Sequence, residues 1–396
     1  MNAAPQNPPL AIGLYLAVVQ FFFALGWIVY IVYLPQLARQ AGLDARWVPW
    51  LLVLDQLVFV LTDLAVGLAS DRAATVVGRI GYAVLAASLV SALAFMALPW
   101  LAPQGSPLLF IAVTLLWVLT TSALRAPPLT LLGRYVARPA LPMTVALSTF
   151  GLGLANAAAP YIGLQLKGIA PHWPFVLSAL GLAAVTLGMV AAERTLAGRA
   201  SKAAAAPATA DRRPTGVQVG AFLAACVVGA FAFQWHQSIS SSALALRWAS
   251  AADLPWLLPA FWVGFNLSLL PAGALTRRLG APATMAIGAE LAMLGTAGAA
   301  FAPGLELLLL AQLASGAGWA RLLWAAFSGA LALGHTGREG LMSGALSATL
   351  ALAALARITI VTASPLAPGQ AADLAGWPAL AFAMCAALLV GNAVRR

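Results

Sequence analysis

The chain consists of twelve long apolar stretches, separated by short breaks that are charged or rich in glycine and proline. A helix rises about 1.5 Å per residue, so about 20 apolar residues cross the hydrocarbon core of a bilayer. The stretches reach this length. The pattern therefore predicts transmembrane helices near residues 10–35, 47–69, 80–101, 107–133, 141–165, 172–193, 217–240, 253–275, 282–302, 305–333, 341–363 and 373–393.

The predicted helices form two groups of six around one polar segment. This segment is rich in alanine, proline and basic residues and has no apolar face to bury, which predicts a flexible or partly helical tether. We therefore expect an all-α membrane protein with an N-terminal six-helix bundle (1–193), a linker (194–216) and a C-terminal six-helix bundle (217–396). The two halves are weakly alike, and paired halves with a site between them are typical of alternating-access transporters.

Composition and charge support this interpretation. The chain is 62% hydrophobic and 8% charged, whereas soluble domains have about 25% charged residues. The net charge of +10 is distributed unevenly between the two sides of the predicted membrane. One side would carry Arg72, Arg79, Arg134, Arg138, Arg194, Arg199, Lys202, Arg212, Arg213, Arg277, Arg278, Arg338, Arg395 and Arg396, and the other side only Arg39, Arg46, Lys167 and Arg247.

Basic residues collect on the cytoplasmic side of membrane proteins. This bias predicts that both termini and the linker are cytoplasmic, in a membrane of the bacterial inner-membrane type. It also explains the positive charge without a nucleic-acid partner, so none is expected.

The sequence contains no pattern typical of an enzyme, a metal site or a cofactor site. Both cysteines, Cys226 and Cys385, lie within predicted spans, and the three histidines are scattered. A glycine-rich phosphate loop with a following Lys-Ser/Thr, the signature of an ATP-driven pump, is not found. We expect neither an enzyme nor a bound cofactor.

The strongest local motif lies between the second and third predicted helices. It contains Gly67, an Asp71-Arg72 pair and, five residues later, a Gly78-Arg79 pair. This pattern resembles the helix 2–3 loop of the major facilitator superfamily (MFS), and its spacing, with Asp63 four residues before Gly67, is most similar to the glycoside–pentoside–hexuronide and sucrose-type branch. Proline often follows the acid in that branch, but the chain has Leu64 there.

The resemblance implies the MFS fold, with a conformational latch between the bundles formed by this loop. Glycine allows helices in membranes to approach closely. Asp71 is expected to reach a helix N-terminus or a cation, for which Arg134 is a candidate. The alternative for Arg72 and Arg79 is that they serve only as topology signals.

Six ionisable residues lie within the predicted spans, where each would cost several kcal/mol if it faced lipid alone. They are Asp55, Asp63, Arg125, Glu290, Arg321 and Arg357. Similar depths in the membrane predict three pairs: Asp63–Arg125, Glu290–Arg321 and Asp55–Arg357. Because helices 2 and 11 face each other in the superfamily, the last pair would close the outer side. The alternative for the first two pairs is a structural role that only satisfies buried charge.

In the superfamily, helices 1, 4, 7 and 10 line the cavity, and here they hold most of the polar and aromatic residues. The substrate-binding candidates are Gln20, Trp27, Tyr30, Arg125, Gln234, His236, Trp319 and Arg321, with Asn156 and Asn266 on neighbouring helices. Aromatic rings could stack on a substrate while amides bind its polar groups. His236 is equally compatible with a structural role. Pro127 and Pro128 are expected to break helix 4 beside Arg125.

These features predict a secondary transporter that works as a monomer in the lipid bilayer. The first hypothesis is alternating-access, proton-coupled symport of a small polar or anionic organic solute, in which Asp55, Asp63, Glu290 and Arg357 serve coupling or gating. Arg125 and Arg321 at similar depths favour an anion, because guanidinium binds carboxylate or phosphate well. Proton-antiport efflux of drugs or metabolites is the second hypothesis. A transport-dead sensor or assembly factor on the same fold is the third.

The predicted topology can be tested by single-cysteine labelling or reporter fusions at Met1, Lys202 and Arg396. All three positions should be cytoplasmic because of the fourteen-to-four distribution of basic residues. A reporter at Lys202 that is found outside the cell would overturn the whole orientation.

Overall fold

A computed structural model describes residues 9–73, 75–203, 215–334, 337–367 and 369–394. These residues form helices and connecting turns, and no strand occurs among them. Eleven of the helical segments are long and apolar enough to cross a membrane. The chain is therefore an all-α, multi-pass membrane protein, as the apolar pattern predicts.

The helices of the N-terminal half match the predicted spans closely. They are α1 (Leu10–Gln40), α2 (Val48–Ala73), α3 (Arg79–Leu101), α4 (Pro107–Thr121), α5 (Ala126–Tyr135), α6 (Leu141–Gln165), α7 (His172–Thr186) and α8 (Met189–Ala203). The helix α8 continues about ten residues into the segment expected to be the linker. The rest of that segment, 204–214, lies outside the described residues, as do Met1 and Arg396.

The C-terminal half is more interrupted. It contains α9 (Gly216–Trp235), α10 (Ser241–Ala245), α11 (Leu254–Leu257), α12 (Pro259–Leu267), α13 (Leu269–Leu279), α14 (Ala281–Ala300), α15 (Leu305–Gly334), α16 (Glu339–Ala363), α17 (Gln370–Asp373) and α18 (Trp377–Val394). The eighth predicted span is divided among α11, α12 and α13, with interruptions at Leu258 and Ser268. Its longest apolar stretch, 254–267, is shorter than the eleven spanning segments.

Two breaks interrupt spanning helices near the middle of the bundle. The fourth span leaves α4 through a 3-10 turn, Ser122–Leu124, and resumes as α5 at Ala126. Proline has no backbone N–H and clashes with the preceding turn, so the break follows from Pro127 and Pro128 as predicted. The second break is a π-helix, His236–Ser240, that joins α9 to α10. It contains neither glycine nor proline, and we did not predict it.

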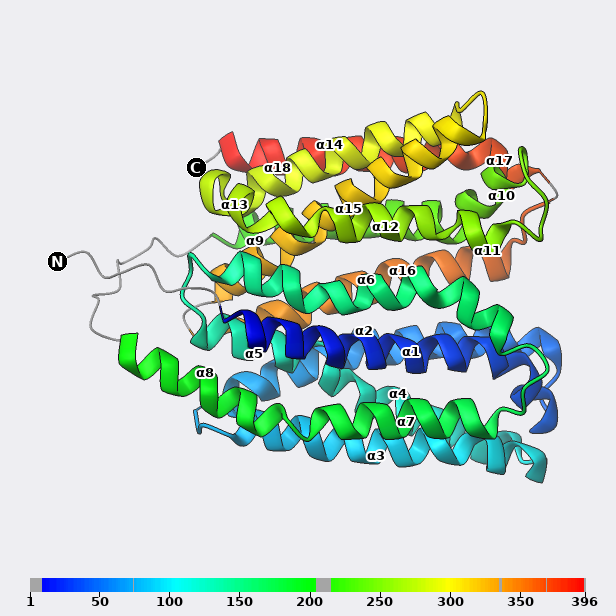
Figure 1. Cartoon of the computed structure of the whole chain (residues 1–396), viewed down its shortest axis with the longest axis horizontal. Coiled ribbons are helices and arrows are strands. Elements are labelled where there is room, and N and C mark those ends of the chain that lie inside the picture. Colours follow the sequence, from blue (N-terminus) through cyan, green and yellow to red (C-terminus); the bar gives the residue numbers. More distant parts are fainter. Residues whose placement is uncertain (1–8, 74, 204–214, 335–336, 368, 395–396) are drawn as a thin grey trace.

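The helices run side by side and form two groups (Figure 1). The helices α1, α3, α4 and α7 lie in one group, and α9, α12, α14, α15 and α18 lie in the other. Between the groups, α2 packs along α16, while α6 packs against α12 and α13. These contacts join the N-terminal and C-terminal halves.

One end of the molecule, which we call the basic end, holds the helix ends that carry most of the arginines. The first residue of α1 and the last residues of α8 and α18 lie there (Figure 1). Arg72, Arg79, Arg134, Arg277, Arg278 and Arg338 all occupy helix ends or caps at this end. The opposite end, the far end, carries Arg39, Arg46, Lys167 and Arg247. The fold therefore separates the basic residues as the topology prediction requires.

Glycines bring the two halves together at the basic end. A Cβ atom on Gly67 of α2 would overlap the carbonyl oxygen of Gly340 on α16, and a Cβ on Gly344 would overlap the backbone of Asp63. Small residues at such a crossing allow two helix backbones to touch. The contact between α2 and α16 thus closes the basic end.

Candidate functional site

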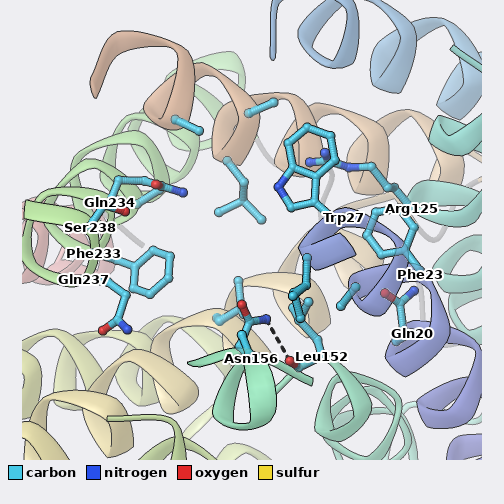
Figure 2. A pocket seen from close by; sticks show the side chains of 18 of the residues that line it. Gln20, Phe23, Trp27, Arg125, Leu152, Asn156, Phe233, Gln234, Gln237 and Ser238 are labelled. Atoms are coloured by element: carbon cyan, nitrogen blue, oxygen red, sulfur yellow. Dashed lines mark hydrogen bonds between the residues drawn. The ribbon is translucent and has the colours of Figure 1, made fainter. Parts of the chain in front are cut away.

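A cavity of about 640 Å³ lies between the two bundles, a volume within the range of about 300–1,000 Å³ that is usual for small-molecule sites. Its walls come from α1, α2 and α6 of the N-terminal half, from α9, α12, α15 and α16 of the C-terminal half, and from the break between α4 and α5. Both halves therefore contribute to a single site, which Figure 2 shows from close by.

The cavity extends toward the far end of the molecule. Its lining includes Ile31 and Val32 in the far half of α1, Leu52 near the start of α2, and Ile358 in the far half of α16. The basic end is closed by the contact of α2 with α16. With the predicted topology, this is an outward-facing arrangement.

The cavity walls are cationic. Arg125 and Arg357 line the cavity, and no aspartate, glutamate, lysine or histidine of the described residues belongs to its lining. A guanidinium on such a wall attracts an anion, because the surrounding protein has a lower effective dielectric constant than bulk water.

Arg125 forms the expected ion pair with Asp63. Its Nε lies 3.2 Å from Oδ2 of Asp63, which is fully buried. Its Nη2 also donates to the carbonyl oxygen of Ser347 on α16, at 3.2 Å, and its Cζ lies 4.5 Å from the ring centroid of Phe59. Oδ1 of Asp63 has no hydrogen-bond partner among the described residues. Arg125 therefore contacts both halves of the molecule.

Arg357 differs from Arg125 because it is unpaired. Its Nε is buried and has no hydrogen-bond partner. No acidic side chain in the described part of the chain forms an ion pair with it. The predicted outer pair of Asp55 with Arg357 is not formed in this conformation. Asp55 instead accepts a hydrogen bond of 2.8 Å from the hydroxyl of Tyr30, inside the N-terminal half. The prediction used the depth of Asp55 along α2, which does not determine the direction in which its side chain points around that helix.

Aromatic rings cover much of the remaining wall. Trp27 lies in the cavity lining and stacks on Trp117, with ring centroids 5.7 Å apart. Trp319, on the opposite half, stacks on Phe233 at 4.4 Å with nearly parallel rings. Both tryptophans thus occupy the cavity positions that we expected from their depth.

The polar candidates Gln20, Asn156 and Gln234 also line the cavity. Gln20 donates to the carbonyl oxygen of Leu124 at 3.1 Å, beside the break before Arg125. Asn156 donates to the carbonyl oxygen of Leu152 at 2.8 Å (Figure 2). These two amides are held by backbone, so only part of their hydrogen-bonding capacity faces the cavity.

Four predicted binding residues lie outside the cavity lining. Tyr30 is fully buried against Asp55. His236 is fully buried, and its Nε2 lies 2.9 Å from Oε1 of Gln312. Asn266 donates to the carbonyl oxygen of Trp262. The side-chain hydrogen bonds of Tyr30, His236 and Asn266 thus lie inside one half, which for His236 fits the structural alternative. Nδ1 of His236 and Oδ1 of Asn266 are buried without a partner among the described residues.

Arg321 is the fourth of these residues, and its predicted pair with Glu290 is wrong. Nη1 of Arg321 donates to the hydroxyl of Ser268 and to the carbonyl oxygen of Ala317, both at 2.9 Å. Glu290 lies on the exposed outer face of α14. The pair was predicted from the similar depths of Arg321 and Glu290 in the membrane. The Arg321 side chain instead points away from the cavity, toward the junction of α12 and α13.

At the basic end, Asp71 of the predicted latch caps a helix of the other half. Oδ1 and Oδ2 of Asp71 accept hydrogen bonds from the backbone N–H groups of Gly340 and Leu341, at 2.6 and 2.8 Å. The N-terminus of α16 supplies these orphan donors and the positive end of the helix dipole. Asp71 thus binds a helix N-terminus of the other half, one of the two partners expected.

The other latch residues contribute less directly. Gly78 precedes α3 with a φ of 89°, a conformation that favours glycine. Arg72 and Arg79 are exposed and have no side-chain partner among the described residues. Arg134 forms no direct ion pair with Asp71, although it attracts that carboxylate at longer range. Arg72 and Arg79 therefore fit the topology-signal alternative.

Several lining residues were not among the predicted binding residues: Phe59, Phe233, Gln237, Ser238 and Trp262. Gln237 and Ser238 follow Gln234 by three and four residues, the spacing that puts side chains on one helix face. That spacing could have identified them. No local signal distinguishes Trp262 from the tryptophans at the membrane interface.

Comparison with known proteins defines the fold. No family model and no curated protein sequence matches the chain. Solved structures match over 97% of its length at 15% sequence identity. They include the human organic anion transporter MFSD10 (TETRAN), with all of that chain covered and a TM-score of 0.72. They also include a bacterial homologue of the iron transporter ferroportin in an outward-facing state, with 99% of that chain covered and a TM-score of 0.72.

A third similar structure is the major facilitator superfamily transporter FucP in the outward conformation, with 98% of that chain covered and a TM-score of 0.64. A likeness at this level of identity establishes the fold. The chain therefore has the fold of MFS transporters, as its helix 2–3 loop predicts, and its cavity occupies the space between the two bundles.

The Asp71 cap leads to a test of closure at the basic end. Asp71→Ala removes two charge-assisted hydrogen bonds, each worth about 1.5–3 kcal/mol, and should open this end. The probe is Ser343→Cys, fully buried behind the cap, in a background in which Cys226 and Cys385 are alanine. Its labelling by N-ethylmaleimide should rise by at least ~10-fold, the equivalent of about 1.4 kcal/mol. Arg72→Ala is the matched control and should leave the rate unchanged. Equal labelling in both variants would contradict the latch.

Proposed function

We propose that this protein is a member of the major facilitator superfamily and a secondary transporter for a small organic anion. Arg125 of the N-terminal half and Arg357 of the C-terminal half would bind this anion. The observation that carries the proposal is the cavity between the two halves, which is lined by two arginines and no acidic residue. Arg357 has no partner in the described part of the chain. An anion supplies the missing counter-charge more effectively than water, because guanidinium binds carboxylate and phosphate through paired hydrogen bonds.

An anion between the arginines would also couple binding to closure. Arg125 belongs to the N-terminal half and Arg357 to α16 of the C-terminal half. A ligand that contacts both would draw the two walls together on the far side, which is the step that alternating access requires. Closure of the far end by the Asp55–Arg357 pair stays a prediction for the opposite conformation, in which Asp55 would have to leave Tyr30.

The Asp63–Arg125 pair supports proton coupling. Asp63 is fully buried, and its Oδ1 has no hydrogen-bond partner. When Asp63 takes up a proton, it loses its negative charge, and Arg125 becomes available to the anion in the cavity. A proton and an anion would then bind together, as symport requires. The remaining expectations for this function are cytoplasmic termini, a bacterial-type inner membrane and a monomer.

The second candidate function is proton-antiport efflux of drugs or metabolites. The aromatic wall favours it, because Trp27, Phe233, Trp262 and Trp319 offer a broad apolar surface for ring-containing compounds. The resemblance of the helix 2–3 loop to the sucrose-type branch would instead favour a sugar. A thermal-shift screen of the purified protein with sugars, organic acids and drugs separates these substrate classes, and a protein that binds but never transports would match the transport-dead alternative.

The anion proposal predicts a specific pattern among three variants. Arg357→Gln and Arg125→Gln should each lower the affinity for the organic acids found in the screen by at least ~10-fold, since each removes a charge-assisted contact of about 1.5–3 kcal/mol. Arg321→Gln is the matched control and should bind normally, because Arg321 lies outside the cavity lining. Isothermal titration calorimetry measures the three affinities. Unchanged binding in both Arg357→Gln and Arg125→Gln would overturn the anion proposal.

If Asp63 carries the coupled proton, its substitution should abolish proton-driven accumulation of substrate but preserve the exchange of substrate across the membrane. Asp63→Asn mimics the protonated acid, so proteoliposomes containing it should still exchange labelled substrate for unlabelled substrate. They should lose the accumulation that an inward proton gradient drives. Glu290→Gln serves as the control, because Glu290 lies on the outer face of α14. Gradient-driven accumulation that persists in Asp63→Asn would assign the proton to another group.

A further inference from the structure

One wall of the cavity carries polar side chains that have no partner. Gln234, Gln237 and Ser238 line the cavity, and none of their side chains makes a hydrogen bond within the described part of the chain. Oε1 of Gln237 is buried and unsatisfied. We call these three residues the amide wall. A buried amide oxygen without a partner costs free energy, and such groups are usually paired with protein, water or ligand.

Four other polar side chains of the cavity lining have partners within the protein. Gln20 and Asn156 donate to backbone carbonyl oxygens, and Ser148 and Thr149 donate to the helix that carries them. Their hydrogen-bonding needs are met largely from within the protein. Gln56 and Ser347 also line the cavity without a side-chain hydrogen bond among the described residues, but the buried lining atoms that lack a partner are Oε1 of Gln237 and Nε of Arg357.

The amide wall is held in place by the π-helix that follows α9. Gln234 is the penultimate residue of α9, while Gln237 and Ser238 lie within the π-turn His236–Ser240. Single π-turns occur often at functional sites, where the wider turn redirects side chains.

A hydrogen-bonded chain behind the wall fixes this turn. His236 contacts Gln312 through Nε2 at 2.9 Å, and Nε2 of Gln312 donates to the hydroxyl of Ser241 at 3.2 Å. The Ser241 hydroxyl in turn donates to the carbonyl oxygen of His236 at 2.9 Å. These contacts link the two sides of the turn to α15, so the cavity-facing amides are supported from behind. A site whose polar groups are held in advance discriminates better between ligands.

The amide wall lies across the cavity from Arg125 and Trp27, which mark what we call the arginine side. Figure 2 shows Gln234, Gln237 and Ser238 on one side and Trp27 and Arg125 on the opposite side, with open space between them. Phe233 adjoins the amide wall, so an apolar body in this space would contact aromatic rings on both sides.

We propose that the substrate is a bifunctional organic anion. Its anionic group binds at the arginine side, its apolar or aromatic body lies between Trp27 and Phe233, and a neutral hydroxyl or amide group at its other end bonds to the amide wall. This inference rests on the proposed function and narrows it, because a simple carboxylate would leave Gln237 unsatisfied. A site built to bind a hydroxyl group rejects the analogue that lacks it.

The test uses three probes that differ by one group each. Phenylacetate has the anion alone, 4-hydroxyphenylacetate has the anion and a distal hydroxyl, and 2-(4-hydroxyphenyl)ethanol has the hydroxyl without the anion. Calorimetry with the purified full-length protein should show 4-hydroxyphenylacetate binding at least ~10-fold more tightly than phenylacetate, the equivalent of one hydrogen bond of about 1.4 kcal/mol. The neutral alcohol should bind more weakly than either acid.

The variant Gln237→Leu keeps the side-chain size but removes the amide. It should bring the affinity ratio of the two acids close to one while the affinity for phenylacetate stays the same, which also shows that the variant is folded. Gln165→Leu is the matched control and should keep the ratio, because Gln165 is exposed and lies outside the cavity lining.

The outcomes distinguish this inference from the proposed function. Equal binding of the two acids to the unaltered protein would overturn the inference and leave the anion proposal standing. A preference for the hydroxylated acid that persists in Gln237→Leu, and in the combined Gln234→Leu, Gln237→Leu and Ser238→Ala variant, would do the same. Preferred binding of the neutral alcohol over both acids would overturn the anion proposal itself.

Discussion

The structure depends on one constraint, which is that a charge inside a membrane-spanning helix must find a partner or face water, because lipid offers neither. Asp63 meets it by pairing with Arg125, and Asp55 by accepting the hydroxyl of Tyr30. Arg357 meets it by facing the cavity. Glu290, on the exposed face of α14, is the exception. The membrane thus places most charges between helices, which is also where a transporter needs them.

The same constraint shapes the contact between the two halves. Glycines at the crossing of α2 and α16 let the helices touch, and Asp71 satisfies the N-terminal amides of α16 from the other half. Both features act at the basic end and leave the far end free to open. The Asp71 cap consists of two hydrogen bonds from backbone N–H groups to one carboxylate, which can be broken and remade more readily than an apolar core.

Irregular helices concentrate the chemistry of the cavity. The break between α4 and α5 places Arg125 at the point where the helix changes direction, and the π-turn after α9 carries Gln237 and Ser238. Non-helical backbone is tolerated at membrane depth where it is buried in protein or lines a cavity. The two irregular segments come from opposite halves and face each other. A ligand between them would therefore contact the parts of both halves that depart most from regular helix.

The sequence by itself determined the order and approximate position of the spanning helices, because a run of apolar residues in lipid has few alternatives to a helix, but it did not show that the eighth span is divided among α11, α12 and α13. It also determined the break at Pro127 and Pro128 and the acidic partner of Arg125, because a missing N–H group and a matching depth can be recognised from positions along the chain. For Asp71 it left two kinds of partner open, a helix N-terminus and a cation. Only the tertiary structure decided where side chains point around each helix. That rotation depends on packing against helices far away in the sequence, so it directed Arg357 into the cavity, turned Arg321 and Asp55 away from their expected partners, and left Glu290 on the outer face. It also revealed the π-turn at His236, which arises from contacts with α15 and from no local residue signal.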